Sequence, residues 1–227
     1  MKIAVDAMGG DYAPQATVQG SIDALNNSNK KLEIILLGDE NQINDILQSQ
    51  FSNNIKVIHC SDEVTMEDNG AKVIKSKPDS SIVQGIQLVK DHKADAFISA
   101  GNTGAQLAVS RLILGRIPHV KKPGLAVYFQ ALNEKKVLCD VGANPEVKSE
   151  HLLQFAIMSS VYLDHVEGIK NPKVGLINIG IEPSKGTELY QQAYKLLSNE
   201  LPNFVGNIES RNFFDSSAHI LVCDGFV

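Results

Sequence analysis

The chain has 227 residues, a formal net charge of −5 and a pI near 5.7, and 43% of its residues are hydrophobic. This length allows one large domain or two small ones, and this composition is sufficient to fill a sizeable core. Nucleic-acid binding is disfavoured, because it usually requires a basic stripe. The three cysteines, Cys60, Cys139 and Cys223, are far apart and lie in or beside apolar runs. They predict buried free thiols and a reducing, cytoplasmic setting.

No targeting segment is visible, and no apolar run reaches the length that spans a bilayer. These observations concern only spanning segments and do not bear on peripheral membrane contact. In the first half of the chain, short apolar runs alternate with helix-like segments. Strands are predicted at 2–6, 32–39, 55–60 and 94–100, and helices at 14–26, 41–50, 80–92 and 103–114.

The second half continues this alternation. The predicted elements are strands at 124–130 and 135–143 with a hairpin-sized link, a helix at 149–166, a strand at 173–180, a helix at 184–199 and a strand at 219–227. The pattern predicts an α/β fold: a mainly parallel sheet with helices on both faces, in three layers. No linker interrupts it, so we predict one continuous domain over 1–227. Because the chain stops just after a strand and an Asp-Gly pair, we also expect a C-terminal truncation.

Four predicted strands end in loops that are rich in Gly, Asn, Ser and Thr and lead into helices. The loops are AMGGD after Asp6, GNTGA after Ala100, GANP after Val141 and GIEPSKG after Ile179. In one parallel sheet they would share the carboxyl edge, where open α/β proteins bind ligands. Glycine amides and helix N-termini favour an anion, so the predicted ligand includes a phosphate or a similar group. Each loop alone is equally well explained as an ordinary tight turn.

Several polar residues in these loops could contact a ligand. Asp6 stands at a strand end, which favours a functional role, whereas Asp11 is equally well explained as a helix cap. Lys185 is predicted at the start of a helix, where its charge opposes the helix dipole, and this favours ligand binding over a purely solvated position. Asn144 and Asn178 are further candidate donors. The six histidines show no metal-ligand spacing and no nucleophile motif is present, so we expect no metal or cofactor.

Basic residues cluster between Arg111 and Lys122. They form either a solvated face or a docking patch for an acidic protein.

Five separated motifs, DAMGGDYAP, ADAFISAGNTGA, DVGAN, INIG…SKG and CDGFV, resemble in order and spacing the bacterial phosphate acyltransferase family of phospholipid synthesis. The resemblance covers nearly the whole chain. It implies transfer of a fatty acyl group from acyl carrier protein to inorganic phosphate, as well as a homodimer and peripheral membrane contact. It also implies a fold related to isocitrate and isopropylmalate dehydrogenases and to phosphotransacetylase. The chain departs from the family pattern at Thr187, Ser210, Asn212 and 117–124, which affects local details of the site.

A thioester is already electrophilic and phosphate is already an anion, so the expected site positions the reactants and stabilises an oxyanion. We predict as catalytic residues Lys185, Asn102 and Asp6. We predict as substrate- or phosphate-binding residues Gly9, Gly10, Asp11, Gly101, Thr103, Gly104, Asn144, Asn178 and Gly186. Two alternatives remain: an NAD(P)-dependent oxidoreductase of related fold, and a non-catalytic module that binds an anion or a carrier protein.

Overall fold

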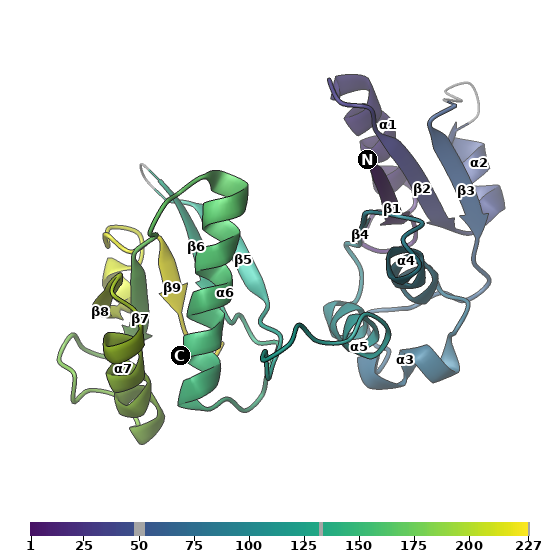
Figure 1. The fold of residues 1–227 in the computed structure, drawn as a ribbon. Coiled ribbons are helices and arrows are strands. Elements are labelled where there is room, and N and C mark those ends of the chain that lie inside the picture. The colour runs from purple at the N-terminus through teal and green to yellow at the C-terminus, as the bar shows by residue number, and fades with distance from the viewer. Residues whose placement is uncertain (48–52, 132–133, 227) are drawn as a thin grey trace. The chain divides into compact units, whose positions relative to one another are not determined.

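The computed structural model describes residues 1–47, 53–131 and 134–226 (Figure 1). The chain divides into two compact units, Met1–Gly115 and Arg116–Val227, and each unit has its own sheet. The prediction of one continuous domain is therefore corrected to two units. The division arises because the strand that follows Gly115 pairs antiparallel with its successor and does not join the first sheet.

The first unit contains a four-stranded parallel sheet in the order β3-β2-β1-β4. Its strands are β1 (Lys2–Asp6), β2 (Glu33–Gly38), β3 (Ile55–His59) and β4 (Ala96–Ile98). Its helices are α1 (Gln15–Asn27), α2 (Glu40–Leu47), α3 (Gly70–Ser76), α4 (Ser81–Lys90) and α5 (Thr103–Ile113). The predicted strands and four of these helices are confirmed, although the predicted end of α2 at 48–50 lies outside the described residues. The sequence did not predict α3, which is short and rich in lysine.

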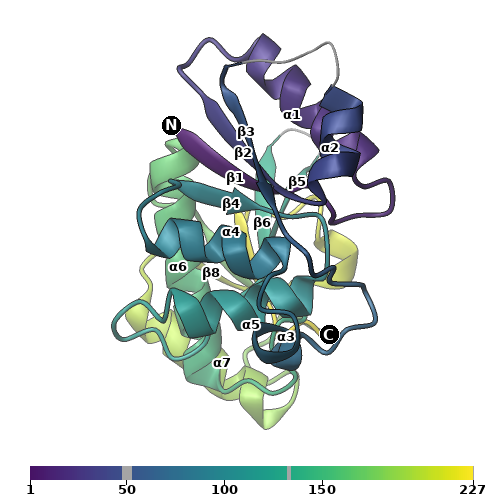
Figure 2. The same ribbon diagram turned by 90° about the vertical axis from the view of Figure 1, so that its right-hand side faces the viewer.

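Helices lie on both faces of this first sheet, as predicted (Figure 1). On one face Val18 and Ile22 of α1 and Ile43 of α2 pack against β2. On the other face Leu88 and Val89 of α4 pack against the sheet. The central strand β2 is buried on both sides, which explains its continuous apolar run. Helices α3, α4 and α5 pack together around a further cluster (Figure 2).

The second unit contains a five-stranded sheet in the order β5-β6-β9-β7-β8. Its strands are β5 (Ala126–Gln130), β6 (Lys135–Cys139), β7 (Val174–Asn178), β8 (Phe204–Glu209) and β9 (Ile220–Val222). The β5–β6 pair is antiparallel, as the hairpin-sized link predicted, and the other pairs are parallel. Leu132 and Asn133 of that link, and Val227 of the predicted last strand, lie outside the described residues. The sequence did not predict β8, because Gly206 and Asn207 interrupt its apolar run.

Two long helices, α6 (Ser149–Glu167) and α7 (Glu188–Glu200), pack on one face of this second sheet. Phe155 of α6 and Leu197 of α7 are among their fully buried contacts with β6, β7 and β9. The opposite face is covered by Phe213 and Ala218, from the segment that includes the short 3-10 helix η1 (Ser210–Asn212). The α/β class is therefore confirmed, with both long helices of this unit on one face.

The cysteines are buried and free, as predicted. Burial raises the pKa of Cys60 and of Cys139 to about 12, so both thiols stay protonated at neutral pH. Within the described ranges, no helix is both long enough and apolar enough to cross a bilayer.

Candidate active site

The two predicted glycine loops of the first unit meet at the carboxyl edge of neighbouring strands, β1 and β4. A Cβ atom added to Gly9 would lie 2.4 Å from Asp6 Oδ2 and 2.8 Å from the Gly101 nitrogen. Gly10 faces Ala100, and a Cβ atom added to Gly10 would lie 3.2 Å from the Ala100 Cβ. The β1 loop therefore approaches the β4 loop backbone to backbone, and only glycine at position 9 leaves room for this contact.

The Asp6 carboxylate holds these two loops together. It is 2% exposed, and it accepts hydrogen bonds from the Met8 N–H at 3.1 Å and from the Ser99 hydroxyl at 2.7 Å. Ser99 Oγ in turn accepts the Gly101 N–H at 3.0 Å. The Gly101 amide is thus engaged within the protein. Ser99 was not among the predicted residues, although it directly follows β4 in the same loop as Gly101.

Asn102 lies at the start of α5 and is buried. Its Oδ1 accepts the Ala105 N–H at 2.9 Å, which caps the helix, and its Nδ2 donates to the carbonyls of Thr65 at 2.9 Å and Asp68 at 3.0 Å. These bonds anchor the loop around 65–68 to the helix. Thr103 and Gly104, the next two residues, are exposed. They stand at the N-terminus of an 11-residue helix, where backbone N–H groups and the helix dipole favour an anion.

Asp11 is exposed in the loop between β1 and α1. Helix α1 starts after Pro14 without a side-chain cap, so the predicted capping by Asp11 does not occur. The negative charge of Asp11 opposes direct contact with phosphate. Its predicted role in orienting other groups stays a prediction.

In the second unit, the buried residue that organises the β6 loop is Asp140, which follows β6 directly. Its Oδ1 accepts the N–H groups of Leu125 at 2.8 Å and Ala143 at 3.2 Å. Its Oδ2 accepts the backbone N–H of Asn144 at 3.1 Å and its side-chain amide at 3.0 Å. The Asn144 amide also donates to the Pro123 carbonyl at 2.7 Å, so Asn144 anchors the loop from inside. Asp140 was not predicted, although, like Asp6, it stands at a strand end shortly before a glycine.

Lys185 lies in the loop between β7 and α7, three residues before the helix, which corrects its predicted position at a helix start. Its side chain is exposed, and its stem lies over Gly180, where an added Cβ would be 2.9 Å from Lys185 Cγ. The Asn178 amide donates to the Lys185 carbonyl at 3.1 Å. An added Cβ on Gly186 would lie 2.5 Å from Asn178 Oδ1. Lys185, Asn178 and Gly186 are therefore together, and the ammonium group extends from a loop whose backbone is held.

The loop after β9 connects these two parts of the second unit. The Asp224 N–H donates to the Tyr190 hydroxyl of α7 at 3.2 Å, and burial raises the pKa of that tyrosine. A Cβ on Gly225 would lie 2.3 Å from the Gly142 nitrogen. The loops after β6, β9 and β7 thus form one connected edge. Asp224 and Gly225 belong to the CDGFV motif, but the sequence did not indicate their structural role.

The four predicted loops therefore lie in two pairs, one at the carboxyl edge of each sheet. The prediction that all four share one edge of one sheet is wrong, because β1 and β4 belong to a different sheet from β6 and β7. Within each unit, the predicted convergence at the carboxyl edge is present.

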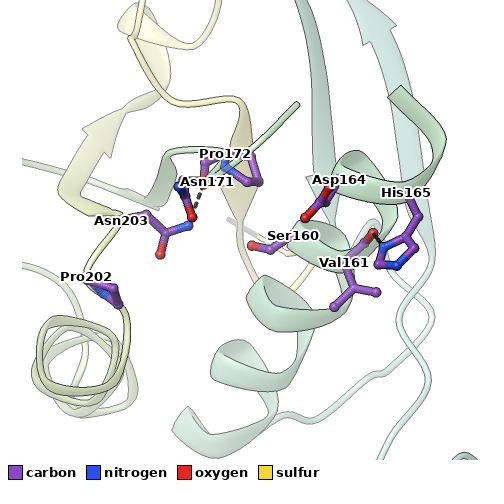
Figure 3. Close-up of a pocket in the computed structure, with 8 residues that line it drawn as sticks. All are labelled: Ser160, Val161, Asp164, His165, Asn171, Pro172, Pro202 and Asn203. Carbon is purple, nitrogen blue, oxygen red and sulfur yellow. Dashed lines mark hydrogen bonds between the residues drawn. The ribbon is translucent and has the colours of Figure 1, made fainter. Parts of the chain in front are cut away.

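A cavity of about 460 Å³ lies elsewhere in the second unit (Figure 3). It lies near the amino ends of β7 and β8, and its lining comprises Ser160, Val161, Asp164, His165, Asn171, Pro172, Pro202 and Asn203. His165 Nδ1 is bonded to the Val161 carbonyl at 2.9 Å, and Asp164 is paired with Lys170. The cavity is at the opposite edge of the sheet from the glycine loops.

Much of the predicted basic cluster is engaged within the second unit. Lys121 pairs with Glu150, Lys122 donates to the Glu146 carbonyl, and Arg116 donates to the Lys121 carbonyl. The Lys121 N–H donates to Gln154 Oε1 at 2.9 Å, and Gln154 Nε2 donates to the His119 carbonyl at 2.8 Å. A docking role for this cluster stays a prediction.

A protein family described as "Fatty acid synthesis protein" matches residues 1–227. The chain is 48% identical over 228 residues to a phosphate acyltransferase of Alkaliphilus oremlandii and 44% identical over 231 residues to one of Dictyoglomus turgidum. Each match covers 100% of this chain and 68% of the relative. The chain belongs to the fatty acid synthesis protein family. The resemblance predicted from the five motifs is confirmed.

Solved structures with the same fold are phosphotransacylases. The EutD phosphotransacetylase from Staphylococcus aureus matches with a TM-score of 0.66 at 17% identity, covering 98% of this chain and 77% of that one. A branched-chain phosphotransacylase from Enterococcus faecalis V583 matches with a TM-score of 0.65 at 17% identity, covering 97% and 78%. These matches confirm the predicted relation to the phosphotransacetylase fold. The relation to the dehydrogenases stays a prediction.

Proposed function

We propose that this member of the fatty acid synthesis protein family is a phosphate acyltransferase that moves a fatty acyl group from acyl carrier protein to inorganic phosphate. The observation that carries the proposal is 44–48% identity over the whole chain to phosphate acyltransferases. A phosphate oxygen attacks the thioester carbon, the tetrahedral oxyanion collapses, the C–S bond breaks, and the carrier thiolate leaves and takes up a proton. The products are acyl phosphate and the free carrier thiol.

Lys185 is the proposed catalytic residue in the second unit. Its ammonium group is solvent-accessible, and the backbone that carries it is held by Asn178. A positive charge placed beside a developing oxyanion lowers its energy. In the first unit, the exposed start of α5 at Thr103 and Gly104 is the proposed anion contact, and Asp6 and Asn102 hold its loop.

The test is detection of acyl phosphate by mass spectrometry after the protein is mixed with acyl carrier thioester and phosphate. Loss of one oxyanion donor costs on the order of 100- to 1000-fold in turnover, so we expect Lys185→Ala to lose activity on that scale. Lys185→Arg, which keeps the charge, should retain more activity. The matched control is Lys195→Ala, since Lys195 is an exposed lysine of α7. Equal activities of the two alanine variants would remove Lys185 from the mechanism.

The protein is further proposed to act as a homodimer through α6. This helix carries an exposed apolar stripe on one side, with exposed fractions of 43% at Ile157, 54% at Val161, 47% at Tyr162 and 59% at Val166. Contiguous apolar surface of this kind typically marks an interface. Val161→Glu should reduce the mass measured by light scattering from dimer to monomer, whereas Lys90→Glu, an exposed charge change on α4, should not. A monomeric unmodified protein would contradict the proposal.

We further propose that the protein is cytoplasmic and contacts the membrane peripherally. Leu112 and Leu114, beside Arg111 at the end of α5, are exposed, and apolar residues next to basic ones favour an anionic bilayer surface. Co-sedimentation with vesicles that contain anionic lipid should fall for Leu112→Glu. Sedimentation that is the same with and without vesicles would contradict membrane contact.

A further inference from the structure

We propose that an apolar groove in the first unit, between α1 and the β1–β4 side of the sheet, binds the acyl chain of the substrate. The inference rests on the proposed function, because it assigns a place to the apolar part of the fatty thioester. The groove has a volume of about 310 Å³ and lies entirely within the first unit.

The floor of the groove is apolar because of strand periodicity. Alternate residues of a strand point to the same face, so Ile3 and Val5 of β1 lie on one side, and Ile98 of β4 lines the groove beside them. The Ile98 side chain is 54% exposed although it lies at a sheet position. A large aliphatic side chain left open to solvent on a sheet face provides a surface that an acyl chain can cover.

The wall of the groove is the small-residue side of α1. Val18 and Ile22 direct the packing of this helix onto β2, and the adjacent side presents to the groove Ala16, Thr17, Gly20, Ser21 and Ala24. A Cβ added at Gly20 would have no atom of the described residues within 4 Å. The space beside the helix is therefore empty, and small side chains keep it so.

The position of the groove identifies its occupant. Its polar end is formed by Asp6, Ser99 and Ala100, the same loops that hold the proposed anion contact at α5, and its far end is formed by Met1 and Leu32. The path follows β1, and five residues at roughly 3.3 Å each give about 16 Å. Carbon–carbon bonds of about 1.5 Å advance roughly 1.25 Å per methylene, so this path holds about 13 methylenes. An acyl chain whose carbonyl lies at the polar end fits both the chemistry and the length.

The test is the dependence of activity on acyl chain length in Gly20→Leu. Each methylene removed from an apolar site costs about fourfold in affinity, so exclusion of four methylenes costs on the order of 100-fold. We expect kcat/KM to fall on that scale for long acyl chains and to stay unchanged for short ones. The matched control is Asp23→Leu, which adds the same side chain to an exposed position of α1 outside the groove lining. An identical chain-length profile in Gly20→Leu and the unmodified protein overturns the proposal.

A binding measurement separates failure of the groove from failure of the proposed function. A fluorescent fatty acid should bind the unmodified protein, be displaced by palmitate, and bind at least tenfold more weakly to Gly20→Leu. Binding with this pattern in a protein that forms no acyl phosphate supports the groove and refutes the reaction. If instead Gly20→Leu lowers the Tm markedly while Asp23→Leu does not, the groove is filled by polypeptide and the proposal is overturned, since a leucine in open space leaves the Tm unchanged or raises it.

Discussion

In both units, hydrogen bonds to a buried aspartate hold the loops at the carboxyl edge of the sheet. The groups that donate these hydrogen bonds differ between the two units. Each has a buried aspartate at a strand end, Asp6 or Asp140, and each brings a glycine against the backbone of a neighbouring loop. Asp140 accepts four hydrogen bonds, all from N–H groups. Asp6 accepts one from an N–H group and one from the Ser99 hydroxyl, which can also act as an acceptor.

This difference shows that burial of a strand-end aspartate does not by itself indicate catalysis. Both oxygens of Asp140 are occupied by donors that cannot change role, so this carboxylate is committed to holding the 140–144 loop. Among the described residues, Asp6 has fewer donors than Asp140, and one of them, the Ser99 hydroxyl, can reverse its hydrogen bond. The groups that donate hydrogen bonds to a carboxylate, and not its burial, therefore distinguish a purely structural aspartate from one that tolerates substitution.

The largest effect is expected from a substitution that breaks the close contact between Gly225 and the Gly142 backbone in the second unit. Gly225→Ala places a Cβ 2.3 Å from the Gly142 nitrogen at a φ of +85°, and we expect it to lower the free energy of unfolding by about 2–4 kcal/mol. The control is Gly168→Ala, where φ is +70° but no atom in the described part of the chain lies within 4 Å of the added Cβ, and where a loss of about 1 kcal/mol is expected. Urea unfolding measures both. Equal losses would mean that the close approach at Gly225 is absent.

The second prediction sharpens the contrast between the aspartates. In Asp140→Asn, one carboxylate oxygen is replaced by an NH₂ group. Whichever oxygen is replaced, the new NH₂ group faces N–H donors that then have no acceptor. We expect the free energy of unfolding to fall by about 2–3 kcal/mol. In Asp6→Asn the Ser99 hydroxyl can accept from the new amide, so the loss should stay below about 1 kcal/mol. Amide hydrogen exchange, measured separately for the two units, reports the loss of stability in the unit that carries the substitution. A larger loss for Asp6→Asn would invert the comparison.

The smallest expected effect is a pH dependence confined to the second unit. His151 Nδ1 accepts the Lys148 N–H at 3.0 Å at the start of α6, and burial, followed by the charge of Lys122, lowers the pKa of this histidine from about 6.5. The unfolded chain therefore binds the proton more readily, so stability falls as the pH drops below about 6.5 towards the lowered pKa. Hydrogen exchange of α6 at pH 7 and pH 5.5 measures the loss. His151→Gln should remove it, and an unchanged slope in that variant would contradict the assignment.

Local pattern was sufficient to predict most strands and helices, because apolar runs such as that of β2 and helical spacing such as that of α6 are properties of neighbouring residues. The pairing of strands is not local. The sequence places β4 and β5 one after the other, yet β5 pairs with β6 in a second sheet. For this reason the predicted single edge was wrong while the individual loops were correctly located.

The predicted roles of the site residues stay predictions, and the structure adds hydrogen-bond partners that the sequence could not indicate. Asn102 was predicted as a catalytic residue and Asn144 as a substrate-binding residue because both are polar and lie in glycine loops. In the structure their amides also donate to carbonyls of distant segments, which anchors the loops. Asp140 could have been found, since its position after a strand and before a glycine repeats the Asp6 pattern. Ser99 could not have been distinguished from an ordinary loop serine, because its partner Asp6 is 93 positions away.

The bonds that tie 119–122 to α6 determine how the polypeptide can be divided for separate production of its halves. A fragment starting at Leu125 would leave Gln154 without the His119 carbonyl and the Lys121 amide, and Glu150 without its lysine. A fragment starting at Arg116 keeps all three connections. The gene should therefore be cut before codon 116, so that residues 116–124 stay with the C-terminal half.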